Sequence, residues 1–265
     1  MPELAEVEYY RKQWLPAYGQ AVTGIYLNAS KRVFRGVDTN ALQRDLAGQL
    51  FTGSEAHGKQ MCFRFGPNIW LGVHLGMTGK MTILSSLESP RKHDHLVLRM
   101  GDERQLVFSD PRMFGRILYA YSKREPAWWA LRPPSILSAE FTFERMHHFL
   151  DRRTKSPIKA VLLMQETFPG IGNWMADEIL WRSRILPSKR CGAIGLRARR
   201  ELYACTRQVC EDAMRVIGTD WGTPPNDWLF NHRWKDGGHC PQTGKSLKRA
   251  QVGGRTTCWS PAWQR

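Results

Sequence analysis

The second residue of the chain could act as a nucleophile. Residues 1–8 read Met-Pro-Glu-Leu-Ala-Glu-Val-Glu, so removal of Met1 would make Pro2 a free N-terminal secondary amine. An α-amino group titrates near pH ~8, against about 10.4 for a lysine side chain, so part of it is unprotonated at neutral pH and can attack an aldehyde carbon. The adduct is a cationic iminium, which favours elimination, and Glu3 and Glu6 follow directly in the sequence. In the alternative interpretation, Pro2 only opens a helix whose dipole the two acids complement.

A second signal lies at residues 170–173, Gly-Ile-Gly-Asn, between two helical patterns. Glycines such as Gly172 let the backbone come close to a phosphate, and Asn173 begins a helix whose free N–H groups favour an anion. Lys159, on the preceding helix, could supply a positive charge. The alternative is a plain packing corner between two helices.

The net charge favours a phosphate-rich partner. The 265 residues include 39 Lys and Arg against 24 Asp and Glu, which gives a formal charge of +15. Residues 151–265 hold 20 basic and 10 acidic side chains, so the C-terminal part is expected to make most of the contacts with a phosphate backbone.

The sequence also lacks the patterns of secreted, membrane-spanning and disulfide-bonded proteins. The sequence has no signal peptide and no run of 18 apolar residues, so we expect a soluble intracellular protein with no membrane partner, in the cytoplasm or nucleoid if the source is a bacterium. The six cysteines form no Cys-x-x-Cys pair and are expected to be reduced thiols.

The spacing of apolar residues predicts the elements that would position these groups. Residues 3–15 show helical spacing, and residues 20–120 contain short apolar runs at 23–27, 60–65, 69–73, 95–100 and 105–108, separated by turn residues. This pattern predicts an N-terminal helix followed by an antiparallel sandwich or barrel. From about residue 140 the pattern is helical, with helices at 157–165, 173–182 and 193–216, and the last 30 residues have hairpin character.

Five groups of residues, in this order, resemble the formamidopyrimidine-DNA glycosylase/endonuclease VIII family. They are Pro-Glu-Leu at 2–4 with Glu6, His-Leu-Gly-Met-Thr-Gly at 74–79, His-Asp-His at 93–95, Asp-Pro-Arg-Met-Phe-Gly at 110–115, and the helical segment from Ile158 and Lys159 to Ala-Asp-Glu-Ile-Leu at 176–180. The resemblance spans the whole chain.

The resemblance implies an α+β fold. Residues 1–130 would form the catalytic domain, an N-terminal helix plus an antiparallel β-sandwich, and residues 131–139 a linker. Residues 140–230 would form a helical DNA-binding domain with a helix-two-turn-helix. Residues 231–265 would form a β-hairpin similar to a zinc finger.

The resemblance also implies a bifunctional DNA glycosylase and AP lyase of base-excision repair. Pro2 would attack C1′ of a damaged nucleotide, expel the base and drive β- and then δ-elimination. Glu3 would carry protons, Glu6 would orient the N-terminus or a water, and Lys59, in a turn between two strands, would contact the phosphate next to the lesion.

Three further residues match those that fill the gap left when such an enzyme extrudes a base. Met77 would be an apolar plug, Arg112 could pair with the orphaned base, and Phe114 would be a wedge beside it. In the alternative interpretation, Met77 and Phe114 belong to the core of the β domain.

The C-terminal hairpin departs from the family pattern. Many members carry four zinc-binding cysteines there, whereas this chain has Cys240, Thr243, Ser260 and Trp263 at those positions. Zinc requires four nitrogen or sulfur ligands, so we expect no metal or other cofactor and a zincless finger from which Arg255 reaches DNA. An alternative set of zinc ligands is conceivable but has no familiar spacing. It consists of His232, His239, Cys240 and Cys258.

A second departure concerns substrate preference. Many relatives carry a long loop that caps 8-oxoguanine after the last helix of the helical domain, and residues 218–228 are too short for one. The expected partner is damaged DNA, bound by a monomer. One alternative is a catalytically inactive DNA-binding protein on the same scaffold, although Pro2, Glu3 and Glu6 all remain. An RNA-binding protein would explain the charge but not the N-terminal residues.

Overall fold

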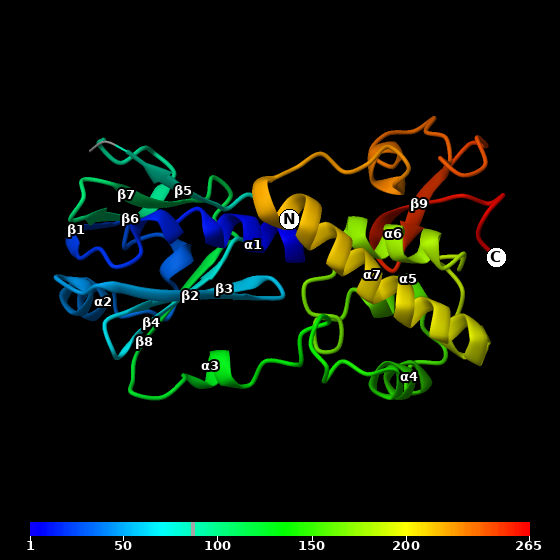
Figure 1. Cartoon of the computed structure of the whole chain (residues 1–265), viewed down its shortest axis with the longest axis horizontal. Helices are drawn as coiled ribbons and strands as arrows, with labels where there is room; N and C mark the ends of the chain where they lie inside the picture. The colour runs from blue at the N-terminus through cyan, green and yellow to red at the C-terminus, as the bar shows by residue number, and fades with distance from the viewer. Residues whose placement is uncertain (86–87) are drawn as a thin grey trace. The chain divides into compact units, whose positions relative to one another are not determined.

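The computed structural model describes residues 1–85 and 88–265, which divide into two compact units (Figure 1). The N-terminal unit comprises Met1–Pro2 and Glu6–Arg132, and the C-terminal unit comprises Glu3–Ala5 and Pro133–Arg265. The chain therefore passes from one unit to the other between its second and third residues, and returns after its fifth.

The N-terminal unit is built on two four-stranded antiparallel sheets. One sheet has the order β1 (Val22–Leu27), β6 (Asp94–Met100), β7 (Gln105–Ser109), β5 (Lys80–Leu84), and the other has the order β2 (Phe51–His57), β3 (Gln60–Phe65), β4 (Ile69–His74), β8 (Arg116–Tyr121). Their inner faces share one apolar core, to which α1 (Leu4–Lys12) contributes Val7. The predicted helix and sandwich are confirmed.

Shorter helical elements complete this unit. They are the 3₁₀ helices η1 (Leu15–Ala17) and η2 (Arg32–Phe34), and the α-helices α2 (Thr39–Leu46) and α3 (Ala127–Ala130). Helix α2 begins after Asp38, whose carboxylate accepts the N–H groups of Asn40 and Ala41 and so satisfies two of the free donors of the first turn. This helix is absent from the sequence-based prediction, as are β2, β5 and β8.

The C-terminal unit contains four α-helices and a hairpin. They are α4 (Phe143–Asp151), α5 (Ile158–Leu162), α6 (Asn173–Arg182), α7 (Leu196–Asp220), and the strands β9 (Lys248–Val252) and β10 (Arg255–Trp259), with short 3₁₀ helices η3 (Cys191–Ala193) and η4 (Leu229–His232) between them. Eight consecutive residues of α6, from Trp174 to Trp181, are buried, so α6 is the central helix of this unit. None of the helices described is long and apolar enough to cross a bilayer.

The turn of the hairpin packs on α5. Gly253 and Gly254 have φ values of +59° and +75°, as a two-residue hairpin turn with positive φ at both positions requires. A Cβ atom on Gly253 would lie 2.6 Å from the Cβ atom of Ala160, so only glycine allows this approach. Arg255 follows the turn directly.

Candidate functional site

Glu3 is held at the N-terminus of α6. Its carboxylate accepts the backbone N–H groups of Gly172 (2.8 Å), Trp174 (3.0 Å) and Met175 (3.1 Å), and the residue is 3% exposed. The first N–H groups of a helix have no partner within the helix, and the helix dipole favours a negative charge there. The helix terminus therefore fixes the carboxylate of the residue bonded to Pro2.

This arrangement corrects the prediction for Gly172. The sequence suggested that Gly172 brings the backbone close to a DNA phosphate, which is wrong in this structure because its N–H group already donates to Glu3. A Cβ atom on Gly172 would lie 2.3 Å from Cδ of Glu3. The anion that the glycine admits is thus an internal carboxylate.

The prediction that Lys159 contacts phosphate is also wrong in this structure. Lys159 has no exposed surface, and its ammonium group donates to the carboxylate of Asp177 and to the backbone oxygen of Asn173 (2.6 Å). Burial lowers the pKa of Lys159, although the charge of Asp177 opposes the shift. Lys159 is an internal link between α5 and α6.

Asp177 joins these helices to the hairpin. Its second carboxylate oxygen accepts Nε (3.1 Å) and Nη2 (2.5 Å) of Arg233 and the backbone N–H of Cys258 (3.0 Å), and Asp177 is completely buried. The buried carboxylate of Asp177 therefore binds two cations, Lys159 and Arg233, and one strand of the hairpin. The sequence analysis assigned no role to Asp177 or Arg233.

Asn173 makes a second connection to the hairpin. Its side-chain amide donates to the backbone oxygen of Thr256 (2.8 Å), the residue after Arg255. Arg255 itself is exposed. Asn173 and Asp177, one turn apart on α6, thus hold the strand from which Arg255 projects.

The residues of the hairpin do not fit a zinc ion. The four positions that carry ligands in many relatives offer here one thiol, two hydroxyls and an indole, from Cys240, Thr243, Ser260 and Trp263, and zinc requires four nitrogen, sulfur or carboxylate ligands. Within residues 1–85 and 88–265, no three His, Cys, Asp or Glu side chains are grouped as metal ligands. Cys240 instead accepts a hydrogen bond from the indole of Trp181 (3.4 Å).

Cys240 lies in a small apolar cluster beneath the hairpin. Cys240 is buried with Cys258, Trp181 and Leu229, and Trp263 packs against them. Burial raises the pKa of the Cys240 thiol, but the neighbouring donors, first the hydroxyl of Ser260, outweigh it and lower the pKa to about 7. The hairpin is therefore packed on the helices by apolar contacts as well as by hydrogen bonds.

Pro2, Glu6 and Lys59 belong to the N-terminal unit. Met1 is 49% exposed, so the bond that must be cleaved to free the Pro2 amine is accessible. Glu6 lies in the first turn of α1. Burial of Tyr10 raises the pKa of its hydroxyl, and the negative charge of Glu6 raises it further. Lys59 is the second residue of the turn between β2 and β3, after Gly58 with a φ of +59°.

Lys59 lies near His74, at the end of β4. Burial lowers the pKa of His74, and the charge of Lys59 lowers it further. Nδ1 of His74 accepts the backbone N–H of Gly76 (3.0 Å), which places the hydrogen of the neutral ring on Nε2. His74 was part of a family motif but had no assigned role in the sequence analysis.

The alternative that Met77 and Phe114 are core residues is wrong. Met77 is 43% exposed and Phe114 is 46% exposed. The guanidinium carbon of Arg112 lies 4.9 Å from the centroid of the Phe114 ring, a cation–π distance. Exposed apolar side chains on two neighbouring loops suit insertion into a base stack.

A buried aspartate holds these two loops together. Asp110 has no exposed surface, and its carboxylate accepts the Thr78 hydroxyl (2.7 Å) and the backbone N–H groups of Gly115 (2.7 Å) and Arg112 (3.3 Å). A Cβ atom on Gly76, whose φ is +62°, would lie 2.5 Å from the Gly115 nitrogen. The structure therefore brings together the three predicted gap-filling residues.

Comparison with known proteins agrees with this fold. Residues 1–117 match the formamidopyrimidine-DNA glycosylase N-terminal domain, and residues 133–223 match the formamidopyrimidine-DNA glycosylase H2TH domain. The formamidopyrimidine-DNA glycosylases of Alkalilimnicola ehrlichii (30% identity over 281 residues) and Roseiflexus sp. (32% over 280 residues) each align over their full length with this full chain. The chain belongs to the formamidopyrimidine-DNA glycosylase family.

Solved structures of similar fold contain DNA. One is a complex of Lactococcus lactis FPG (MutM) with a FAPY-dG containing DNA, which has 27% identity and a TM-score of 0.88 and covers 99% of this chain and 100% of that chain. Another is MutM in complex with carbocyclic 8-oxo-G containing DNA, with 27% identity, a TM-score of 0.87 and complete coverage of both chains.

Proposed function

We propose that this protein is a DNA glycosylase and AP lyase of base-excision repair whose nucleophile is the amine of Pro2. The observation that carries the proposal is the position of Glu3, an acid bonded to Pro2 and held by three N–H donors at the start of α6. The DNA in the related L. lactis FPG and MutM complexes supports damaged DNA as the partner. We place a monomer of the protein with the bacterial chromosome in the cytoplasm.

The reaction follows from the chemistry of the two residues. The lone pair of the Pro2 nitrogen forms a bond to C1′ of the damaged nucleotide, and the bond from C1′ to the base breaks with a proton transferred to the base. The attack leaves the Pro2 nitrogen positively charged with one hydrogen. The Glu3 carboxylate accepts this proton and passes it to the sugar ring oxygen, whose bond to C1′ breaks to leave an iminium at C1′. Loss of a C2′ proton then expels the 3′ phosphate, and a second elimination expels the 5′ phosphate. Glu6 orients the N-terminus or a water.

The proposed DNA contacts come from loops and turns. Met77, Arg112 and Phe114 fill the gap left by the extruded base, because a base inside a duplex is out of reach of the amine. Lys59 and Arg255 contact phosphates, and Asn173 positions the hairpin through Thr256. No metal takes part.

The substrate is a ring-opened purine, a hydantoin or an oxidised pyrimidine in preference to 8-oxoguanine. Helix α7 ends at Asp220 and η4 begins at Leu229, so no long segment follows the helix to cover an extruded base. Because 8-oxoguanine differs little from guanine, its recognition needs many contacts to the base edges. Single-turnover excision compared across these lesions tests the preference, and 8-oxoguanine opposite cytosine as the fastest substrate would contradict it.

Borohydride trapping tests the central proposal. The wild-type protein should form a covalent complex with abasic-site DNA, and an uncleaved N-terminal tag should abolish it, because an amide nitrogen has no nucleophilic lone pair. A tagged protein that cleaves abasic DNA at the wild-type rate would refute the role of Pro2. A wild-type protein that binds the DNA without trapping would favour the inactive DNA-binding alternative.

Zinc at one equivalent per chain, by elemental analysis, would refute the metal-free hairpin.

A further inference from the structure

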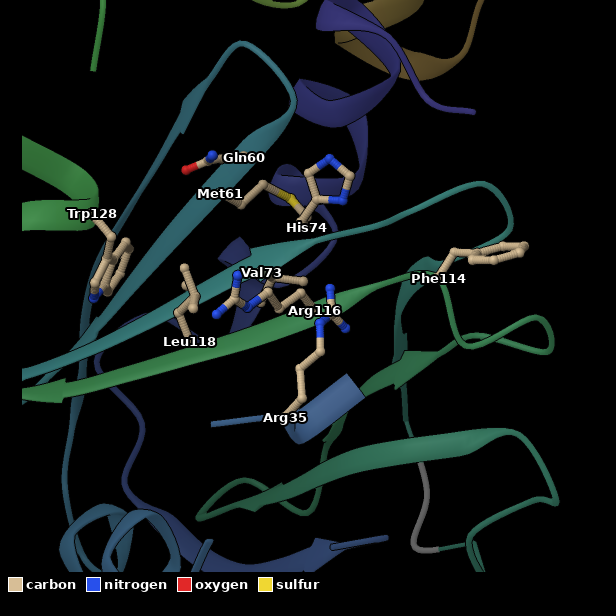
Figure 2. A pocket seen from close by; sticks show the side chains of 10 residues that line it. Arg35, Gln60, Met61, Val73, His74, Phe114, Arg116, Leu118 and Trp128 are labelled. Atoms are coloured by element: carbon tan, nitrogen blue, oxygen red, sulfur yellow. The ribbon is translucent and has the colours of Figure 1, made fainter. Parts of the chain in front are cut away.

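The N-terminal unit has a recess whose lining residues, apart from Phe114, have no role in the proposed reaction. This cavity, of about 250 Å³, lies on the sheet formed by β2, β3, β4 and β8, and Figure 2 shows the side chains that line it. Its volume is just below the range typical of pockets for drug-sized ligands, so it can hold a single small group.

Cross-strand register places three of the lining residues, Gln60, His74 and Arg116, on the outer face of the sheet. Met61, Val73 and Ile117 form one row and are buried in the core between the sheets. Side chains alternate along a strand, so the adjacent row, in which His74 of β4 pairs with Gln60 of β3 and Arg116 of β8, points to the opposite face. The cavity thus opens on the outer face of the sheet, and Met61 and Val73 of the core also line it.

One wall of the cavity is flat and apolar. A Cβ atom on Gly72 would lie 2.8 Å from the indole of Trp128 and 3.0 Å from Cβ of Leu118, so the glycine allows the indole to lie directly on the sheet. Trp128 is half-buried, and Figure 2 shows it on the side of the cavity opposite Phe114. An indole beside an aliphatic side chain suits the face of a planar ring.

The other side of the cavity is cationic. Arg35 and Arg116 both line it, and within the described part of the chain no carboxylate lies within ion-pair distance of either. Arg35 is oriented by hydrogen bonds from Nη1 to the backbone oxygens of Gly115 (3.0 Å) and Arg32 (3.1 Å). Burial and then the charge of Arg116 lower the pKa of Arg35, so the two guanidinium groups repel each other without a counter-ion.

We propose that this cavity binds one nucleotide, with its phosphate on Arg35 and Arg116 and its base against Trp128. Arginine is suited to phosphate because its planar donors match the phosphate oxygens, and an aromatic face accepts any base. The nucleotide could belong to the DNA strand beside the lesion, since Phe114 also lines the cavity, or could be a free mononucleotide. The DNA source rests on the proposed glycosylase function.

Two binding measurements test the proposal and separate the sources. The first is the affinity for an abasic-site duplex as a function of salt, and the second is a calorimetric titration with free dAMP. The variants are Arg116→Gln and Trp128→Leu, with Arg64→Gln as the matched control, because Arg64 is an exposed arginine of the same sheet and lies 4.4 Å from the Trp70 ring, outside the cavity. Thermal melting of each variant shows whether it folds, and Arg116 is exposed, so its replacement should not affect folding.

For a nucleotide of the DNA strand, Arg116→Gln should reduce the salt slope by about one phosphate, and Trp128→Leu should weaken duplex binding roughly tenfold at an unchanged slope. For a free nucleotide, dAMP should bind the wild type and the control but neither variant, while duplex binding stays constant. Variants that match Arg64→Gln in both measurements would overturn the proposal. Borohydride trapping by the wild type shows separately whether the glycosylase proposal holds, and the dAMP titration tests the cavity even if it does not.

Discussion

Replacing Asp177 by Asn should destabilise the C-terminal unit more than any other single change of charge on α6. Asp177 is completely buried and accepts hydrogen bonds from Lys159, Arg233 and the backbone of Cys258. Asn preserves the shape but removes the negative charge, which leaves two buried cations without an anion. Removing one partner of a buried ion pair costs about 3–5 kcal/mol.

This cost translates into a measurable loss of thermal stability. For a unit of this size, 1 kcal/mol corresponds to about 3 °C in melting temperature, so Asp177→Asn should melt roughly 10 °C below the wild type. The variant should also bind DNA more weakly, with a smaller salt slope, because Asn offers one acceptor oxygen to Lys159, Arg233 and the Cys258 N–H, which weakens the attachment of the strand that carries Arg255. Differential scanning calorimetry and salt-dependent binding measure the two effects.

Asp212→Asn is the matched control. Asp212, on α7 of the same unit, is 8% exposed and also accepts from two arginines, Arg182 (2.7 Å) and Arg215 (2.8 Å). Arg182 keeps a second carboxylate, Glu178 at 3.0 Å, and the Arg215 side chain is 77% exposed, so neither cation is stranded. If the two variants lost the same stability, or if Asp177→Asn melted within about 3 °C of the wild type, the reasoning from a buried charge network would be refuted.

Three further predictions concern the site. Gly172→Ala should abolish borohydride trapping, since its Cβ would lie 2.3 Å from Cδ of Glu3, whereas Gly195→Ala, with nothing within 4 Å, should trap as the wild type does. Arg112→Ala should slow excision from duplex DNA at least about tenfold more than cleavage of a single-stranded abasic site, and equal losses would contradict a gap-filling role. The pKa of the Cys240 thiol is about 7 in the folded protein, against 9.0 for an ordinary thiol. Between these pH values the folded state therefore binds fewer protons than the unfolded state. The free energy of unfolding should rise with pH across that window and fall as the pH drops through 7. Melting temperatures at pH 7 and pH 9 should therefore differ more for the wild type than for Cys240→Ala, and an equal difference would show that the thiol does not ionise there.

The parts of the fold that were predictable are those with a strong local pattern. The five apolar runs correspond to β1, β3, β4, β6 and β7, and the helix predicted at 173–182 has the observed bounds of α6. The three strands that were missed, β2, β5 and β8, all lie at sheet edges. An edge strand has fewer buried neighbours, so it tolerates polar residues and glycine, as in the Phe-Thr-Gly-Ser-Glu-Ala-His sequence of β2, and its apolar alternation is weak.

In the candidate site, too, the features that could be predicted are those with a strong local pattern. The loops of Met77 and Phe114 could be predicted because each carries a distinctive local motif, but their contact depends on Asp110, which reaches Thr78 across 32 positions of sequence. Such a contact leaves no periodic signal in the chain. The same holds for the buried aspartate beneath the hairpin, which a helical pattern identifies only as one polar position among apolar ones.

The errors at Gly172 and Lys159 have one physical cause. A glycine turn that leads into a helix, with a lysine one helix earlier, is favourable for any anion, and the local sequence cannot distinguish a phosphate from a carboxylate of the chain itself. The anion at the turn is Glu3, 169 positions away, and the anion at the lysine is Asp177, 18 positions away. The helix N-terminus at Gly172 and the ammonium group of Lys159 therefore each already have an anionic partner within the C-terminal unit. A phosphate contact by this unit must come from groups that remain exposed, of which Arg255 is the one predicted from the sequence.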